Sequence, residues 1–146
     1  MVFAPEGLGF NIVMAGPVDH STLHFKQGDG FEVKGDAFAT HFDQCRCVIA
    51  KLQVPQGTDH KSMDSFLAGL LDSFRLRVHV TSENPAHELV LDGLPGTSHA
   101  MMFGPVLVRI WIAVAGNDVI LISYSGPIQR DRELEEHFLR TFKKTS

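Results

Sequence analysis

The chain has 146 residues, of which 44% are hydrophobic and 21% charged, and its formal net charge is −4 at pH 7. This composition is typical of one globular domain, and it excludes a disordered, collagen-like or disulfide-scaffold protein. The 17 acidic side chains outnumber the 13 basic ones, and neither half of the chain has a basic excess. We therefore expect no nucleic-acid partner, because nucleic-acid binding depends on clustered Lys and Arg.

We expect residues 1–146 to form a single domain in which residues 1–9, with one proline and two glycines, are loosely ordered. No secretory signal pattern is visible near the N-terminus. The longest apolar stretch, residues 110–115, is far shorter than the roughly 20 residues that span a bilayer. The expectation is a protein without a transmembrane segment, cytoplasmic on the chain as given, or exported if a signal peptide has been removed.

Short apolar runs bounded by glycine, proline and acidic residues predict strands in the first third of the chain. The predicted elements are a strand over 12–14, a hairpin of residues 21–25 and 31–40 around Gly28-Asp29-Gly30, and a strand over 45–54 after a turn at Asp43-Gln44.

Apolar side chains then recur with a helical period between residues 62 and 74. Thr58 or Ser62 is expected to cap this helix, while Asp59 and Asp64 place negative charge near its positive end. Beyond it, alternation predicts a strand over 75–80, and a loop over 82–85 follows. Further strands are predicted over 87–91 and 98–103, joined by a turn over 92–96.

The most apolar segment is a predicted hairpin of residues 106–115 and 119–125, joined at Gly116-Asn117-Asp118. Both faces of these strands are apolar and Arg109 is the lone charge, which indicates central strands that need cover on both sides. A last helix over 131–143 carries a stripe of Leu134, Phe138 and Phe142. The expected fold class is therefore α+β, an antiparallel sheet covered by helices on its faces as an α/β/α sandwich.

Phosphate-binding glycine loops, nucleophile elbows and metalloprotease or EF-hand motifs do not occur in the sequence. The candidate metal ligands are His41, Cys45 and Cys47, an imidazole and two thiols of the kind that bind zinc or copper. Cys45 and Cys47 would lie about 6.6 Å apart on a straight strand, so buried free thiols are the simpler interpretation. His20 and His24, about 13 Å apart when extended, cannot share one metal without a bend. We expect no bound metal or cofactor.

The order of elements resembles a known family. A strand ending at Gly16-Pro17, two hairpin strands and one amphipathic helix precede an L-D-G-x-P-G turn at 91–96. A long hairpin and the step Gly126-Pro127 then lead to a helix ending in Phe138-Leu139 and Phe142-Lys143. Over residues 10–142 this series resembles the PsbP/Mog1-like proteins, a superfamily that includes small bacterial proteins.

The resemblance implies an α/β/α sandwich and a binding or accessory role. Members include a photosystem subunit, a Ran-binding factor and secretion-related chaperones, and the chain carries none of their specific motifs. We expect a non-enzymatic module that binds another protein. The alternative is a protein that binds a small ligand or metal in a pocket beside the sheet. An enzyme of unrecognised type is a third hypothesis, although no anchor residue for catalysis is visible.

Overall fold

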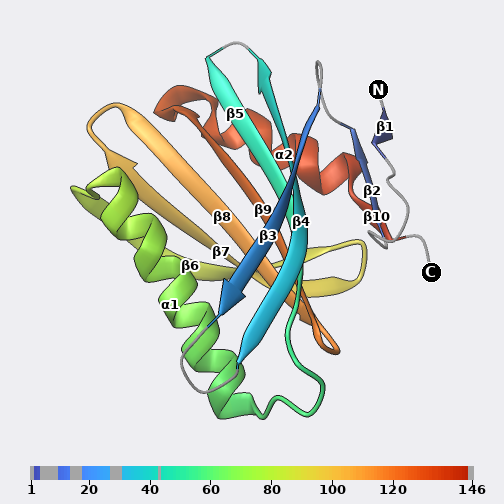
Figure 1. The fold of residues 1–146 in the computed structure, drawn as a ribbon. Helices are drawn as coiled ribbons and strands as arrows, with labels where there is room; N and C mark the ends of the chain where they lie inside the picture. Colours follow the sequence, from blue (N-terminus) through green and yellow to red (C-terminus); the bar gives the residue numbers. More distant parts are fainter. Residues whose placement is uncertain (1, 4–9, 14–17, 27–30, 43, 145–146) are drawn as a thin grey trace.

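A computed structural model describes residues 2–3, 10–13, 18–26, 31–42 and 44–144 of the chain. Most of these residues belong to a seven-stranded antiparallel sheet with the strand order β3-β4-β5-β9-β8-β7-β6 (Figure 1). The strands are β3 (Asp19–Lys26), β4 (Glu32–Phe42), β5 (Cys45–Gln53), β6 (Ser82–Leu91), β7 (Leu94–Phe103), β8 (Val106–Ala115) and β9 (Asp118–Pro127).

Most strand pairs join neighbours in the sequence through short turns. The exception is β5 with β9, which meet in the middle of the sheet because the chain leaves β5, crosses one face as helix α1 (His60–Val78) and returns from the far edge through β6, β7 and β8. The turn between β6 and β7 contains Asp92 at φ 49° and Gly93 at φ 79°. Two successive positive φ angles are those of a type I′ hairpin turn, and Asp-Gly is among its preferred sequences.

The central strands are buried on both faces, as the sequence indicates. Residues 107–113 of β8 and 119–124 of β9 are all buried, and their side chains divide between two apolar clusters. The face that carries α1, called the α1 face, contains Leu52, Ile110 and Leu121 with Phe66 of the helix. The opposite face, called the α2 face, contains Ile49, Trp111 and Ile122.

Helix α1 covers the predicted helical stretch of residues 62–74 and extends beyond it at both ends, from His60 to Val78. Asp59 is the N-cap, since its carboxylate accepts a hydrogen bond from the Ser62 amide at 2.7 Å; the predicted caps Thr58 and Ser62 do not have this role. The predicted strand over 75–80 is wrong, because the helix runs on to Val78 and ends at His79 with φ 51°. Its apolar alternation is misleading, since Leu76 is 78% exposed.

The end of the chain forms the second helix and a small sheet. A short 3-10 turn (Ile128–Arg130) leads into α2 (Asp131–Thr141), of which the side chains of Leu134 and Phe138 lie outside the described part. The buried ring of Phe142 packs edge-on against Trp111, with ring centroids 5.6 Å apart. After α2, β10 (Lys143–Lys144) forms a three-stranded sheet with β1 (Val2–Phe3) and β2 (Phe10–Val13), so Lys143, the last residue of the predicted helix, belongs to a strand.

The predicted α/β/α sandwich is wrong. The molecule is mostly one seven-stranded sheet, and each face carries one short helix and no helical layer (Figure 1). Seven strands about 4.8 Å apart span roughly 29 Å, whereas a helix with its side chains is about 10 Å wide. A single helix therefore covers only part of its face of the sheet. Nearly all residues of the outer strands β3 and β6 are exposed.

One smaller expectation is wrong, and others concern residues outside the described part of the chain. The predicted loop over 82–85 belongs to β6, whose register shifts between Asn84 and His87; a bulge next to Pro85 is compatible with an edge strand. The turn at 28–30 and most of residues 1–9 lie outside the described residues. No helix among the described residues has the length and apolar character needed to cross a membrane.

Candidate functional site

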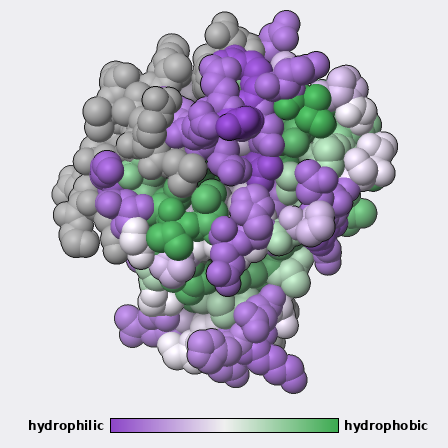
Figure 2. Space-filling view, turned by 180° about the vertical axis from the view of Figure 1, so that it is seen from behind, coloured by the Kyte–Doolittle hydropathy of each residue, from purple (hydrophilic) through white to green (hydrophobic). Residues whose placement is uncertain are grey.

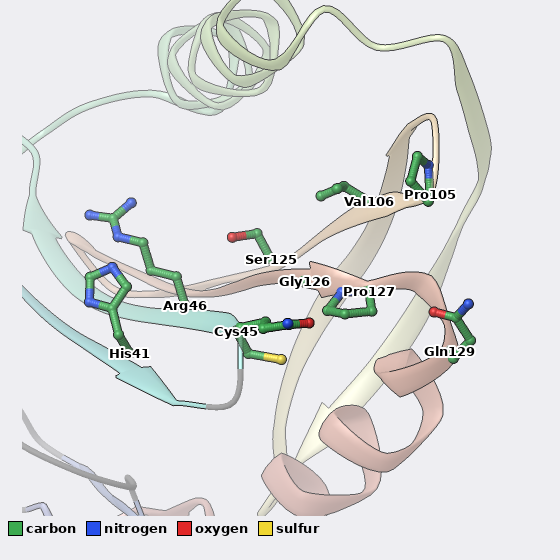
Figure 3. A pocket seen from close by; sticks show the side chains of 10 residues that line it. His41, Cys45, Arg46, Pro105, Val106, Ser125, Gly126, Pro127 and Gln129 are labelled. Carbon is green, nitrogen blue, oxygen red and sulfur yellow. The ribbon is translucent and has the colours of Figure 1, made fainter.

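An open cavity of about 720 Å³ lies at one end of the sheet, where the β4–β5 turn, the β7–β8 turn and the end of β9 meet (Figure 3). Strands β4, β5 and β9 supply its polar wall, and the β7–β8 turn with Pro127 supplies its apolar wall. The lining residues are His41, Gln44, Cys45, Arg46, Pro105, Val106, Ser125, Gly126, Pro127 and Gln129.

The polar wall consists of three side chains from three neighbouring strands. His41 lies directly opposite Arg46 in the β4–β5 register, and Arg46 lies directly opposite Ser125 in the β5–β9 register. Opposite residues in an antiparallel pair point to the same face, and all three belong to the α1 face. Figure 3 shows their side chains rising from the same side of the strands.

The Arg46 guanidinium makes no hydrogen bond or ion pair with a described residue. Elsewhere in the described chain, arginines are paired with acids: Arg75 with Asp72 and Glu83, Arg109 with Asp131, Arg130 with Glu133, and Arg132 with Glu136. Arg77 also has no acid partner among the described residues, but it lies in the last turn of α1, where the helix dipole favours a cation. Arg46 has no such compensation within the described residues.

The opposite wall and its rim are apolar and partly open to solvent. Phe103 is directly opposite Val106, and Val106 is directly opposite Pro127, so these three share the α1 face. Phe103 is 47% exposed and Val106 is 37% exposed. The Ile128 amide donates to the Pro105 carbonyl at 3.0 Å, which places another exposed apolar residue beside the turn. The rim thus combines apolar side chains with the adjacent cation of Arg46.

The structure does not bring His41, Cys45 and Cys47 together. Cys45 and Cys47 belong to the apolar cluster of the α2 face, whereas His41 shares the α1 face with Arg46. Figure 3 shows the side chains of His41 and Cys45 on opposite sides of the strands. The two thiols are buried and free, and the described residues contain no group of three potential ligands placed to hold a metal ion. Burial, with a contribution from Cys45, raises the pKa of the Cys47 thiol to about 12, which disfavours the thiolate that metals bind.

Four other histidines serve separate local roles. His20 pairs with Asp36 at 2.8 Å and His24 pairs with Glu32 at 2.6 Å, both on the exposed β3–β4 hairpin. His79 ends α1. His99 lines a smaller cavity of about 290 Å³ between α1 and the β7–β8 strands, where burial and then Arg75 lower the pKa of its imidazole.

A buried ionic cluster beneath α2 was missed by the sequence analysis. The Arg109 guanidinium donates to both carboxylate oxygens of Asp131 and, at 2.8 Å, to the Ser98 hydroxyl. Its Nε atom also lies 3.0 Å from Glu135 Oε2, and the Tyr124 hydroxyl donates to Asp131. The signal that could have revealed this cluster is Arg109 as the lone charge in an apolar strand, because a buried charge needs a partner of opposite charge.

The cluster joins α2 to the sheet and leaves the surface over the helix polar. Arg132, Glu133 and Glu136 of α2 are exposed, and the face of the molecule seen from behind is largely hydrophilic with separate apolar patches (Figure 2). Because Arg109 already bonds to several partners, this cluster is less suited to binding a ligand than the cavity around Arg46 is.

Comparison with known proteins adds no family to this description. No protein-family model matches the chain, and the search of curated proteins finds no similar sequence.

Proposed function

We propose that the protein is a non-enzymatic binding module that holds a segment of another protein in the cavity between Arg46 and the β7–β8 turn. The observation that carries this proposal is the coincidence of an open cavity of about 720 Å³ with an exposed apolar rim. Exposed apolar groups beside a concave surface are typical of interaction sites, and the aromatic ring of Phe103 is suited to anchor a partner.

The arrangement of the polar side chains favours binding over catalysis. His41 and Ser125 are the nucleophile and base types present in the cavity, but β5 lies between their strands. Two strand spacings separate them by about 10 Å, whereas a base activates a nucleophile at roughly 3 Å. Cys45 is nearer in sequence, but its thiol lies on the other face of β5 from the His41 imidazole.

A photo-crosslinking amino acid at position 103 tests where a partner binds. In the native cell, we expect a defined adduct from position 103 and none from position 90, because Val90 is even more exposed, at 55%, but lies at the other end of the sheet beside the β6–β7 turn. The crosslinked protein is then purified and its affinity for the isolated module is measured, because a crosslink alone does not establish specific binding.

A charge placed in the apolar wall provides the decisive comparison. We expect Val106→Glu to weaken binding of that partner at least tenfold, whereas Val114→Glu leaves the affinity unchanged. Val114 lies at the other end of the same strand and, at 40% exposed, is a matched control. Equal affinity in both variants would reject this surface. Retention of a small molecule in the cavity, with no protein adduct, would favour the small-ligand alternative.

A further inference from the structure

We infer that the cavity recognises an acidic side chain of an apolar partner segment, with the carboxylate held by Arg46 and His41. This inference rests on the proposed function, and it names the chemistry that the cavity selects. It is carried by the charge pattern of the lining, by the position of the donors and by the shape of the opposite wall.

The described lining of the cavity contains no acid, although the protein is rich in acids. The whole sequence has 17 Asp and Glu against 13 Lys and Arg, yet none of the described lining residues is Asp or Glu. The lining instead offers hydrogen-bond donors: the guanidinium of Arg46, the imidazole of His41, the hydroxyl of Ser125 and the amides of Gln44 and Gln129. Such a set lacks a strong acceptor for a cation and matches an anion.

The β5 register places these donors around one point. Arg46 stands on the central strand of three, with His41 opposite on one side and Ser125 opposite on the other. Each neighbour is therefore about 5 Å away between Cβ atoms. A carboxylate in contact with the planar guanidinium, which donates in a fork that fits its two oxygens, is then within reach of a second donor from either neighbouring strand.

The unpaired state of Arg46 favours a ligand that arrives from outside. A cation that already had an acidic neighbour would give up that ion pair on binding, as Arg109 would lose its bonds to Asp131. Arg46 has no such bond to a described residue. Its interaction with a partner carboxylate is therefore a gain that no broken pair offsets within the described chain.

The apolar wall determines what flanks the acid. Val106 and Pro127 share the α1 face with Arg46 across β9 and β8, and Phe103 extends the same surface. An extended peptide places alternate side chains on one side. The inferred partner segment thus carries an Asp or Glu for Arg46 and an apolar residue two positions away for the wall.

Electrostatic range adds a measurable signature. The protein carries a formal charge of −4, so it repels an acidic partner weakly at long range, and the attraction is confined to the neighbourhood of Arg46. The Debye length is about 8 Å at physiological ionic strength. Added salt shortens this length and so screens the attraction between Arg46 and the partner carboxylate. We therefore expect added salt to weaken binding of the acidic segment and to leave the binding of a neutral analogue unchanged.

An NMR titration with two synthetic peptides tests the inference. The first peptide, Ser-Asp-Ser-Leu-Ser-Asp-Ser, places Asp and Leu two positions apart on one side of an extended chain, and the second replaces each Asp by Asn at unchanged shape. We expect the Asp peptide to shift the amide resonances of Arg46 and Ser125, and to bind at least tenfold more tightly than the Asn peptide. Arg46→Gln should remove this preference. Arg132→Gln, at an exposed arginine of α2, should preserve it.

The outcomes separate this inference from the proposed function. Equal binding of both peptides at the cavity, or a preference that survives Arg46→Gln, overturns the carboxylate inference while the cavity stays a protein-binding site. The absence of resonance shifts at the cavity with either peptide also overturns it. The proposed function fails separately, through equal partner affinity of the Val106→Glu and Val114→Glu variants.

Discussion

Arg109 in the middle of β8 donates from Nε and Nη2 to the two oxygens of Asp131, at 2.7 and 2.8 Å, and so fixes the first residue of α2 to the sheet. The Arg109 side chain is 10% exposed and that of Asp131 is 22% exposed. Removing one member of a buried pair leaves the other charge without compensation, which costs about 3 to 5 kcal/mol.

We therefore expect Arg109→Met to lower the free energy of unfolding by about 3 kcal/mol, because Asp131 and Glu135 are then left beneath α2 without their cation. Denaturant titration followed by circular dichroism measures the change. The control is Arg132→Gln, which breaks a solvent-exposed pair with Glu136 and should change stability by less than about 0.5 kcal/mol. Similar losses in the two variants would show that the buried pair contributes no more than a surface pair.

The same pair predicts how stability depends on pH. Burial by itself favours the neutral acid, but hydrogen bonds from Arg109 and Tyr124 outweigh it and hold the pKa of Asp131 below its ordinary value. A depressed folded-state pKa contributes stability above the unfolded pKa, near 4, and this contribution is lost as the pH falls through the folded pKa.

Asp131→Asn should accordingly be less stable than the natural protein at pH 7, and the difference should shrink as the pH falls below about 4. Unfolding free energies measured at several pH values give this difference directly. A gap that stays constant down to pH 2.5 would mean that the Asp131 charge is not the group responsible.

A close approach between β7 and β8 predicts a second sensitive position. A Cβ atom on Gly96 would lie 2.5 Å from the indole of Trp111, which is held by its hydrogen bond to the Leu89 carbonyl at 2.9 Å. Gly96→Ala should therefore destabilise the protein by about 1 to 3 kcal/mol, because the ring has to move within a packed core.

Gly69 supplies the matched control for this substitution. It lies in α1 with nothing within 4 Å of an added Cβ, so Gly69→Ala should stabilise the helix by up to about 1 kcal/mol. The fluorescence of Trp111, the one tryptophan of the sequence, reports the displacement independently of stability. An unchanged spectrum together with unchanged stability in Gly96→Ala would contradict the predicted clash.

The raised pKa of Cys47, about 12, predicts an unreactive thiol. At pH 8 its thiolate is a minute fraction, and the side chain is also buried, so iodoacetamide should modify it only after unfolding. In the Cys45→Ser variant, which leaves Cys47 as the sole thiol, mass spectrometry should detect no adduct in native buffer and one adduct in urea. Native labelling at the urea rate would contradict this burial.

Much of the local structure could be predicted from residue patterns, because its causes are local. The Asp92-Gly93 turn, the helical stripe from residue 63 to 74 and the doubly buried β8–β9 hairpin all depend on conformational preference and periodicity within a few residues. Prediction failed where a local pattern allowed two structures. Residues 75–80 alternate like a strand, but most of them continue α1, since the helix is already formed and Arg75 bonds to Asp72 and Glu83.

The candidate site could not be predicted in this way, because its residues are distant from one another in the sequence. Arg46 and Ser125 are 79 positions apart, and they become neighbours only when β9 pairs with β5. In the same way, no spacing shows that Arg109 meets Asp131 from a separate helix. Sequence reasoning named His41, Cys45 and Cys47 as candidate metal ligands, with buried free thiols as the simpler interpretation, and strand alternation around the β4–β5 turn sends His41 and the two cysteines to opposite faces.

Composition determines the acidic surplus of this chain, and residue periodicity determines its two amphipathic helices and its apolar central hairpin. Tertiary structure decides the strand order, the coverage of the sheet by single helices and the cavity around Arg46, whose described lining contains no acid. The physical reason is that hydrophobic periodicity specifies which side of an element is buried, whereas cross-strand register specifies which side chains meet.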